Sequence, residues 1–140
     1  MALLFTALFS VIIQACLATE HKVGDTGSWS LNGTYQKWAD SKTFYVGDTL
    51  ALYYTKSQHS VVETDSAGYQ SCVPSNPLVR DDSGNTVVHL KKAGTHYFIC
   101  ATPGHCSDGM KFSVSVLEST PTTDASAAAT VAPSINLFFS

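Results

Sequence analysis

Between residues 21 and 117, hydrophobic and polar side chains alternate in short runs that are divided by turn residues. The hydrophobic positions with a period of two are Leu50, Leu52 and Tyr54, then Val88 and Leu90, then Phe112, Val114 and Val116. That period is typical of β-strands with one buried face. Nine glycines, often next to Asp or Asn, separate the runs. Many short strands at this length predict an all-β sandwich or barrel.

Two local elements can be placed within this pattern. Residues 91–94, Lys-Lys-Ala-Gly, are typical of a hairpin turn and would join a strand at 86–90 to a strand at 95–100. No window of twelve or more residues carries the apolar stripe of a helix. We therefore expect only short helical turns, with a turn or two at residues 66–72.

The first eighteen residues have a different composition from the rest. An apolar run ends in the small residues Ala15, Cys16 and Ala18, and it is short for a membrane span. Such a run followed by small residues predicts a secretory signal, cleaved after Ala18, although no Lys or Arg precedes it. An uncleaved N-terminal anchor is the alternative. A cleaved signal implies an oxidising destination, where disulfides persist.

The composition changes again after Glu118. Residues 119–130 are mainly Ser, Thr, Ala and Pro and cannot bury a core. Small residues, a polar spacer and an apolar end suggest a glycolipid-anchor signal, but the apolar end is short, and a flexible O-glycosylated tail is the alternative. Asn32-Gly33-Thr34 is an N-glycosylation sequon in a turn-like segment, so we expect a glycan at Asn32. The predicted organisation is a signal at 1–18, one domain at 19–118 and a tail at 119–140.

Charge and length exclude several classes of function. Hydrophobic residues make up 44% of the 140 residues and charged residues 14%, with a net charge of −3. A nucleic-acid-binding module normally has a strongly basic face, so nucleic acid is not expected as a partner. The chain is too short for a dehydrogenase or kinase fold. It also contains neither of the glycine-rich motifs that cradle nucleotide phosphates.

The cysteines indicate a metal site. Once Cys16 leaves with the signal, Cys72, Cys100 and Cys106 remain. An odd number of cysteines in a secreted domain leaves one thiol to explain. An incidental buried thiol or an intermolecular disulfide would explain it, and so would a metal ligand.

A loop of potential ligands favours the metal. Cys100, His105 and Met110 are five residues apart, and Pro103-Gly104 and Gly109 bend the chain between them. They offer a thiolate, an imidazole and a thioether. Soft sulfur with nitrogen selects copper over magnesium or calcium, and a weak Met ligand is typical of a blue-copper site. Zinc would be expected with more Cys or His and without Met.

The neighbours His105 and Cys106 indicate which cysteine binds the metal. Side chains of adjacent residues in extended chain point in opposite directions. If His105 faces the metal, Cys106 faces away and is free to pair with Cys72. Cys100 is then the metal ligand, and the disulfide would fix the ligand loop to the rest of the sandwich.

A trigonal copper site needs a second imidazole. His21 lies near the new N-terminus, where chains tend to fray. His89 lies opposite the apolar face of its strand, and His96 is about 13 Å from Cys100 along the same strand. His59 precedes a strand, Ser60-Val61-Val62, near one end of the sandwich. By elimination, His59 is the best second imidazole.

These residues resemble a known family, the phytocyanins, which are plant blue-copper proteins that include plantacyanins, uclacyanins and stellacyanins. The resemblance covers residues 21–117. The matching motifs are Val23-Gly24-Asp25, Trp29, Trp38-Ala39, Phe44-Tyr45-Val46-Gly47-Asp48, His59-Ser60-Val61-Val62-Glu63, Tyr69 with Cys72, residues 94–100 (GTHYFIC), and His105-Cys106-Ser107-Asp108-Gly109-Met110-Lys111. Several separate motifs in the same order make the resemblance specific.

The resemblance implies a Greek-key β-sandwich of two sheets and a complete copper site. By position, His59, Cys100 and His105 would be equatorial ligands and Met110 the axial ligand, and the family disulfide falls on Cys72 and Cys106. Stellacyanins have Gln at the axial position, so the chain is more similar to uclacyanins and plantacyanins. Early nodulin-like relatives lack the ligands, whereas all four are present here. The short tail differs from the longer stalk and anchor of many uclacyanins.

The sequence thus predicts an extracellular (apoplastic) type 1 copper protein that transfers single electrons by Cu(I)/Cu(II) cycling and is not an enzyme. We expect a monomer whose redox partner is a small molecule or protein of the cell wall. A glycolipid anchor would place it on the outer face of the plasma membrane. The alternatives are a cell-surface or cell-wall glycoprotein in which copper is incidental, and a copper buffer.

Overall fold

The computed structural model describes residues 17–119 of the chain. Only Leu17 and Ala18 of the predicted signal and Ser119 of the predicted tail are described, so the rest of both segments lies outside these residues. None of the helices within residues 17–119 has the length and apolar character needed to cross a membrane.

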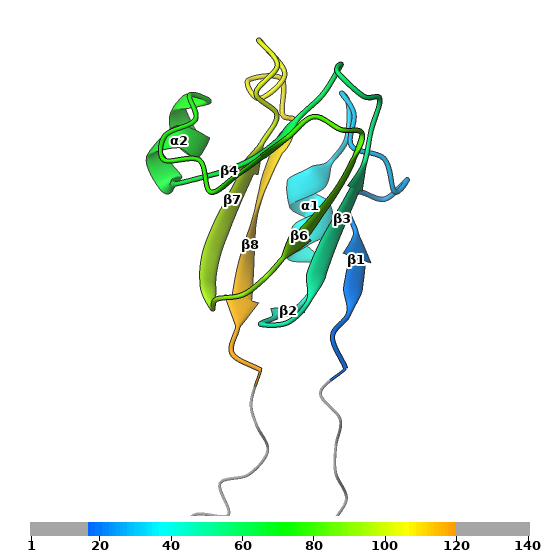
Figure 1. The fold of residues 1–140 in the computed structure, drawn as a ribbon, viewed down its shortest axis with the longest axis vertical. Helices are drawn as coiled ribbons and strands as arrows, with labels where there is room; N and C mark the ends of the chain where they lie inside the picture. Colours follow the sequence, from blue (N-terminus) through cyan, green and yellow to red (C-terminus); the bar gives the residue numbers. More distant parts are fainter. Residues whose placement is uncertain (1–16, 120–140) are drawn as a thin grey trace, which may run out of the picture. The chain divides into compact units, whose positions relative to one another are not determined.

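The described residues form two β-sheets with two short helices (Figure 1). The smaller sheet has the strand order β1 (Glu20–Lys22), β3 (Thr49–Tyr53), β6 (Asn85–His89). The larger sheet has the order β2 (Phe44–Tyr45), β8 (Lys111–Leu117), β7 (Gly94–Ile99), β4 (Val61–Thr64), β5 (Val79–Asp81). Neighbouring strands are mostly not consecutive in sequence, so the chain crosses repeatedly between the sheets. The predicted fold class, a two-sheet β-sandwich, is confirmed.

The core contains the side chains that the period of two predicted. Phe112, Val114 and Val116 of β8 are at most 3% exposed, and Val88 and Leu90 are buried as well. Aromatic rings fill the space around Phe112, whose centroid lies 5.6 Å from that of Trp29 and 5.8 Å from that of Trp38, both in edge-to-face geometry. These contacts give the sandwich a rigid interior beneath the loops at its ends.

The two helices are each six residues long. Helix α2 (Ser66–Ser71) occupies the predicted place, and the Asp65 side chain caps it by accepting a hydrogen bond from the Gly68 amide at 2.8 Å. Helix α1 (Tyr35–Asp40) was not located from the sequence. No side-chain hydrogen bond caps it, and three of its side chains are buried. Packing against the core therefore stabilises α1, and local sequence signals contribute little.

The predicted hairpin at residues 91–94 is wrong. β6 pairs with β3 in one sheet, whereas β7 pairs with β4 and β8 in the other. The four residues between β6 and β7 therefore cross from sheet to sheet. A turn signal shows that the chain changes direction, but strand pairing depends on partners far away in sequence.

The expected fraying at His21 is also wrong. His21 lies in β1, which pairs in parallel with β3, and its Nε2 atom is 3.0 Å from Oδ2 of Asp48. β1 begins, and β8 ends, at the end of the sandwich opposite the 100–110 loop (Figure 1).

Candidate metal centre

The three nearest potential ligands come from two connections at one end of the sandwich. His59 lies in the connection from β3 to β4, two residues before β4 begins. Cys100 directly follows β7, and His105 lies in the loop that leads on to β8. The ends of paired strands thus bring together residues that are far apart in sequence.

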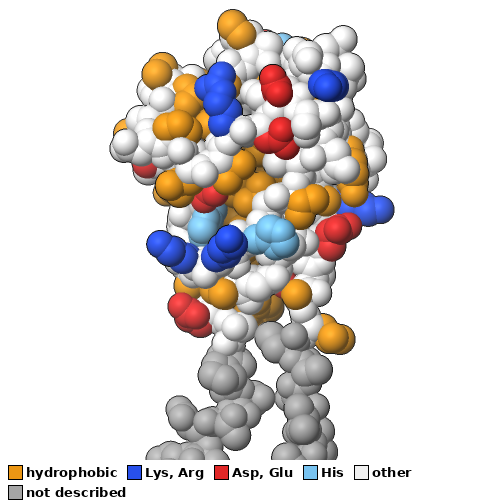
Figure 2. All heavy atoms as spheres, in the orientation of Figure 1, with side chains coloured by type: hydrophobic (Ala, Val, Ile, Leu, Met, Phe, Trp, Pro, Cys, Tyr) orange, Lys and Arg blue, Asp and Glu red, His pale blue; other side chains and the backbone are white. Residues whose placement is uncertain are grey.

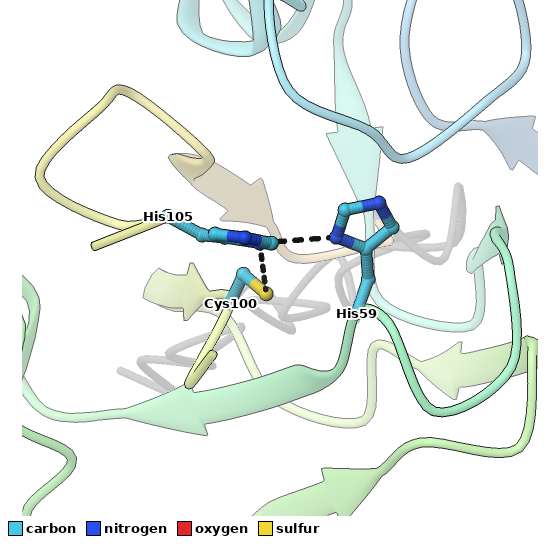
Figure 3. Close-up of side chains that lie close together, drawn as sticks. All are labelled: His59, Cys100 and His105. Carbon is cyan, nitrogen blue, oxygen red and sulfur yellow. Dashed lines mark hydrogen bonds between the residues drawn. The ribbon is translucent and has the colours of Figure 1, made fainter. Parts of the chain in front are cut away.

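The ligand atoms of these side chains converge on one point (Figure 3). Nδ1 of His59 is 3.1 Å from Nδ1 of His105, and Sγ of Cys100 is 3.6 Å from Nδ1 of His105. All three ligand atoms lie within 4.8 Å of one another. Metal–nitrogen and metal–sulfur bonds are about 2.0–2.3 Å long, for example with zinc, so atoms at these separations can bind one ion together.

The protonation chemistry of the cluster also suits a metal. Two neutral imidazoles that face each other through Nδ1 need a proton between them, and a metal ion replaces that proton. Burial, together with the nearby His105, lowers the pKa of His59 below its ordinary value, which favours the neutral ring that a metal ligand must have. Cys100 is a free cysteine and 1% exposed.

Hydrogen bonds of Ser60 connect the segment that carries His59 to the segment that carries Cys100. Its amide donates a hydrogen bond to Sγ of Cys100 at 3.4 Å, and its hydroxyl accepts one from the Ala101 amide at 3.0 Å. The indole Nε1 of Trp29 donates to the Ser60 carbonyl at 3.0 Å, from within the core. These roles of Ser60 and Trp29 were not predicted from the sequence. The position of Ser60 directly after a ligand was the only available signal.

Backbone hydrogen bonds hold the 100–110 loop in a closed shape. The Cys100 amide donates to the Met110 carbonyl at 3.0 Å, and the Met110 amide donates to the His105 carbonyl at 2.9 Å. Gly104 and Gly109 have φ values of 83° and 97°, which other residues rarely adopt. Met110 is 1% exposed and belongs to the same core cluster as Cys100. Its predicted role as axial ligand stays a prediction.

The predicted disulfide is confirmed. Cys72 and Cys106 are bonded, with a Cα–Cα distance of 5.6 Å. Cys72 follows α2, and Cys106 follows His105 directly, so the bond fixes the ligand loop to α2. It also leaves Cys100 as the free cysteine of the described part of the chain.

The remaining histidines lie outside the cluster. His96 contacts Glu63, with Nδ1 and Oε1 2.6 Å apart, and His89 is exposed. His21 contacts Asp48, as described above. Of the imidazoles weighed in the sequence analysis, the structure places only His59 beside Cys100 and His105.

Comparison with known proteins gives the same class as the site. The family model described as "Plastocyanin-like domain" matches residues 29–110. The solved structure of cucumber basic protein, a blue copper protein, is 37% identical with a TM-score of 0.64, and the match covers 70% of this chain and 99% of that one.

Curated relatives point to one branch of that class. The blue copper protein of Pisum sativum is 45% identical over 117 residues, which are 82% of this chain and 62% of that protein. Uclacyanin-3 of Arabidopsis thaliana is 43% identical over 114 residues, which are 81% of this chain and 51% of that protein. The chain thus spans between half and two thirds of the length of these two relatives.

A two-sheet β fold with a buried cysteine and two histidines at one end defines the class of blue-copper proteins. Within this class, the chain belongs to the plastocyanin-like family, and its relatives place it among the phytocyanins. The cluster and the family together confirm the predicted cofactor, one type 1 copper ion.

Proposed function

We propose that this protein is a one-electron carrier and not an enzyme, with His59, Cys100, His105 and Met110 as ligands of its copper ion. One observation carries the proposal: two imidazoles and a free, buried thiol converge at one point. When bound, copper supplies Cu(I)/Cu(II) chemistry. Two nitrogens, a thiolate and a weak thioether suit both oxidation states and leave no open position for a substrate.

The surroundings of the ligands favour electron transfer. The disulfide, the Ser60 hydrogen bonds and the backbone bonds of the loop restrain the ligands, so a change of oxidation state requires little movement. His59 and His105 are half-buried, and both line an open cavity of about 600 Å³. An electron would enter or leave through these imidazole edges, and the partner would be a small molecule or protein of the cell wall.

Cyclic voltammetry of the copper-loaded protein tests this function. A reversible one-electron wave that persists over repeated cycles is expected, because the restrained ligands serve both oxidation states. A protein that binds copper but gives an irreversible wave, or loses the ion on reduction, would instead be a copper buffer or a glycoprotein with incidental copper.

We propose further that the protein is exported through its first eighteen residues, and that it acts as a monomer outside the cell without nucleic acid as a partner. N-terminal sequencing of protein recovered from the medium or the cell wall tests this, with Thr19 expected as the first residue. Protein that retains Met1 inside the cell would contradict export. Phospholipase treatment of intact cells distinguishes a glycolipid-anchored form, which is released, from protein already in the medium.

The sequon at Asn32 supports export. Asn32 is exposed in a turn with φ of 71°, so a glycosyltransferase could reach its side chain. Asn32→Gln is expected to remove the mass shift that N-glycosidase treatment produces in the exported protein. An unchanged mass in the untreated variant would show that Asn32 carries no glycan.

A further inference from the structure

Asp48 is a buried carboxylate that contacts three residues of two neighbouring segments, Thr19 and His21 at β1 and Tyr45 in β2. It is 3% exposed. Oδ1 accepts from the backbone nitrogen of Thr19 at 2.8 Å, and Oδ2 accepts from the amide of Tyr45 at 3.0 Å and lies 3.0 Å from Nε2 of His21. Burial alone would raise the pKa of Asp48, but the bonds from Thr19, His21 and Tyr45 outweigh it and lower the pKa, so the carboxylate is charged.

Within residues 17–119, Thr19 is the first residue that hydrogen bonds hold to the sandwich. Its carbonyl accepts from the Thr49 amide at 2.9 Å, which continues the pairing of β1 with β3. Leu17 and Ala18, which precede it, are exposed, Leu17 by 82%. The nitrogen atom that Asp48 contacts is also the nitrogen of the peptide bond that the predicted cleavage after Ala18 would break.

We propose that the Asp48 carboxylate forms an ion pair with the α-ammonium group of Thr19 once the Ala18–Thr19 bond has been cut, and that this ion pair anchors β1. This inference rests on the export step of the proposed function. An endopeptidase would hydrolyse the bond: the hydroxyl of water goes to the Ala18 carbonyl carbon, and the nitrogen of Thr19 takes the remaining proton and a second one from solvent. Cleavage thus converts a neutral amide donor into a cationic one without moving the nitrogen.

The change of the Thr19 nitrogen from an amide to an ammonium group should stabilise the fold. The amide of Thr19 already makes a charge-assisted hydrogen bond to the Asp48 carboxylate, and an ammonium group in its place adds the Coulomb attraction of an opposite charge. β1 is three residues long, so a single contact at its start affects the whole strand. An amide at this position leaves the buried carboxylate with only neutral backbone donors and His21, whereas an ammonium group adds an opposite charge at neutral pH.

Three forms of the domain test the pairing. One begins with a free Thr19 amine, one begins at Ala18, and one begins with Nα-acetylated Thr19, which keeps the N–H donor and removes only the charge. In denaturant unfolding at neutral pH, we expect the unfolding equilibrium constant of the free-amine form to be roughly fivefold or more below those of the other two. Equal constants for all three forms would overturn the proposal.

A double-mutant cycle assigns the effect to Asp48. Asp48→Asn keeps an oxygen acceptor and removes the charge, so acetylation should then change the unfolding constant by less than about twofold. Glu20→Gln is the matched control. It removes an exposed negative charge from the residue that follows Thr19, and it should leave the effect of acetylation intact. An effect of acetylation that survives Asp48→Asn, or disappears in Glu20→Gln, would also overturn the pairing. If Asp48→Asn does not fold, the comparison of the three forms that retain Asp48 tests the proposal by itself.

The copper site provides an independent readout. The 100–110 loop lies at the end of the sandwich opposite the start of β1 (Figure 1). All three forms should therefore bind copper with the same visible spectrum. Failure of the pairing would leave this spectrum unchanged, whereas the lack of a copper site would remove it in every form. Failure of export would show separately, because N-terminal sequencing would then find Met1 on the protein inside the cell.

Discussion

At the scale of single residues, the metal centre depends on a few side chains with separate tasks. Cys100 and His105 could be predicted from the sequence because they share a short loop with Met110. His59 could be reached only by elimination and by resemblance, because it is distant in sequence and no local pattern links it to Cys100. Ser60, which forms hydrogen bonds with both Cys100 and Ala101, had only its position directly after His59 to indicate a role.

Met110 is the residue expected to tune the reduction potential. A thioether stabilises Cu(II) less than an amide oxygen does, so Met110→Gln should lower the potential, and Met110→Leu, which removes the donor, should raise it. For a one-electron couple, a shift of about 59 mV is a tenfold change in the equilibrium constant, which voltammetry resolves easily. Equal potentials in all three proteins would mean that Met110 only packs in the core.

At the scale of elements, the period of two predicted the strands correctly, whereas the turn signal at residues 91–94 predicted the wrong pairing. The runs at β6 and β8 bury the expected side chains, because alternation depends only on local backbone geometry. The assignment of β6 and β7 to different sheets depends on β3, β4 and β8, so the short link between them resembled a hairpin. Helix α1 was not located because packing stabilises it.

The link between the ligand loop and α2 is the disulfide. The double variant Cys72→Ser, Cys106→Ser should lower the free energy of unfolding by up to about 4 kcal/mol, from the loop-closure entropy of a 34-residue separation. Denaturant unfolding measures this loss. Because Cys100 is untouched, the variant should still form a coloured copper complex, although with weaker binding. A variant that folds but gives no coloured complex would mean that a cysteine of this pair is the ligand.

Asp48 joins β1, β2 and β3 and should affect stability in acid. Its pKa in the folded protein lies below the ordinary value of 3.8, so its contribution is complete above that value and is lost as the pH falls through the folded pKa. Asp48→Asn should therefore cost most stability near neutral pH, with the difference from the wild type shrinking below about pH 4. Thermal unfolding of the copper-free proteins across this range measures it. A difference that grows towards acid would contradict the assignment.

At the scale of the whole molecule, the metal centre and the start of β1 lie at opposite ends of the sandwich (Figure 1). The metal centre lies at one end, beside a cavity lined by Ser30, Leu31, Ser57, Gln58, His59, Thr102 and His105, none of which is permanently charged. On the face shown in Figure 2, acidic and basic side chains are interspersed around exposed hydrophobic ones. A second cavity, of about 360 Å³, includes Leu78 and lies away from the metal centre.

If electrons pass through the cavity beside His59 and His105, a charge placed there should change the rates with charged reagents. Leu31 is 37% exposed and lines this cavity. For the reduced protein at low salt, Leu31→Glu should slow oxidation by hexacyanoferrate(III) and speed oxidation by a cationic cobalt(III) complex, each by roughly two- to fivefold, with smaller effects at high salt.

Stopped-flow absorbance measures these rates, and Leu78→Glu is the control. It adds the same charge at an exposed position that lines the other cavity. Equal effects of the two substitutions would show that electrons do not pass through the cavity beside His59.

The central claim is that His59, Cys100 and His105 form a type 1 copper site, and a Cu(II) titration followed by visible absorption tests it most directly. The folded protein should develop an intense blue thiolate-to-copper band that saturates at one equivalent. Cys100→Ser replaces the soft thiolate with a hard oxygen, so it should stay folded and give no such band. A blue band that survives Cys100→Ser, or a folded wild type that gives no band with copper, would contradict the account.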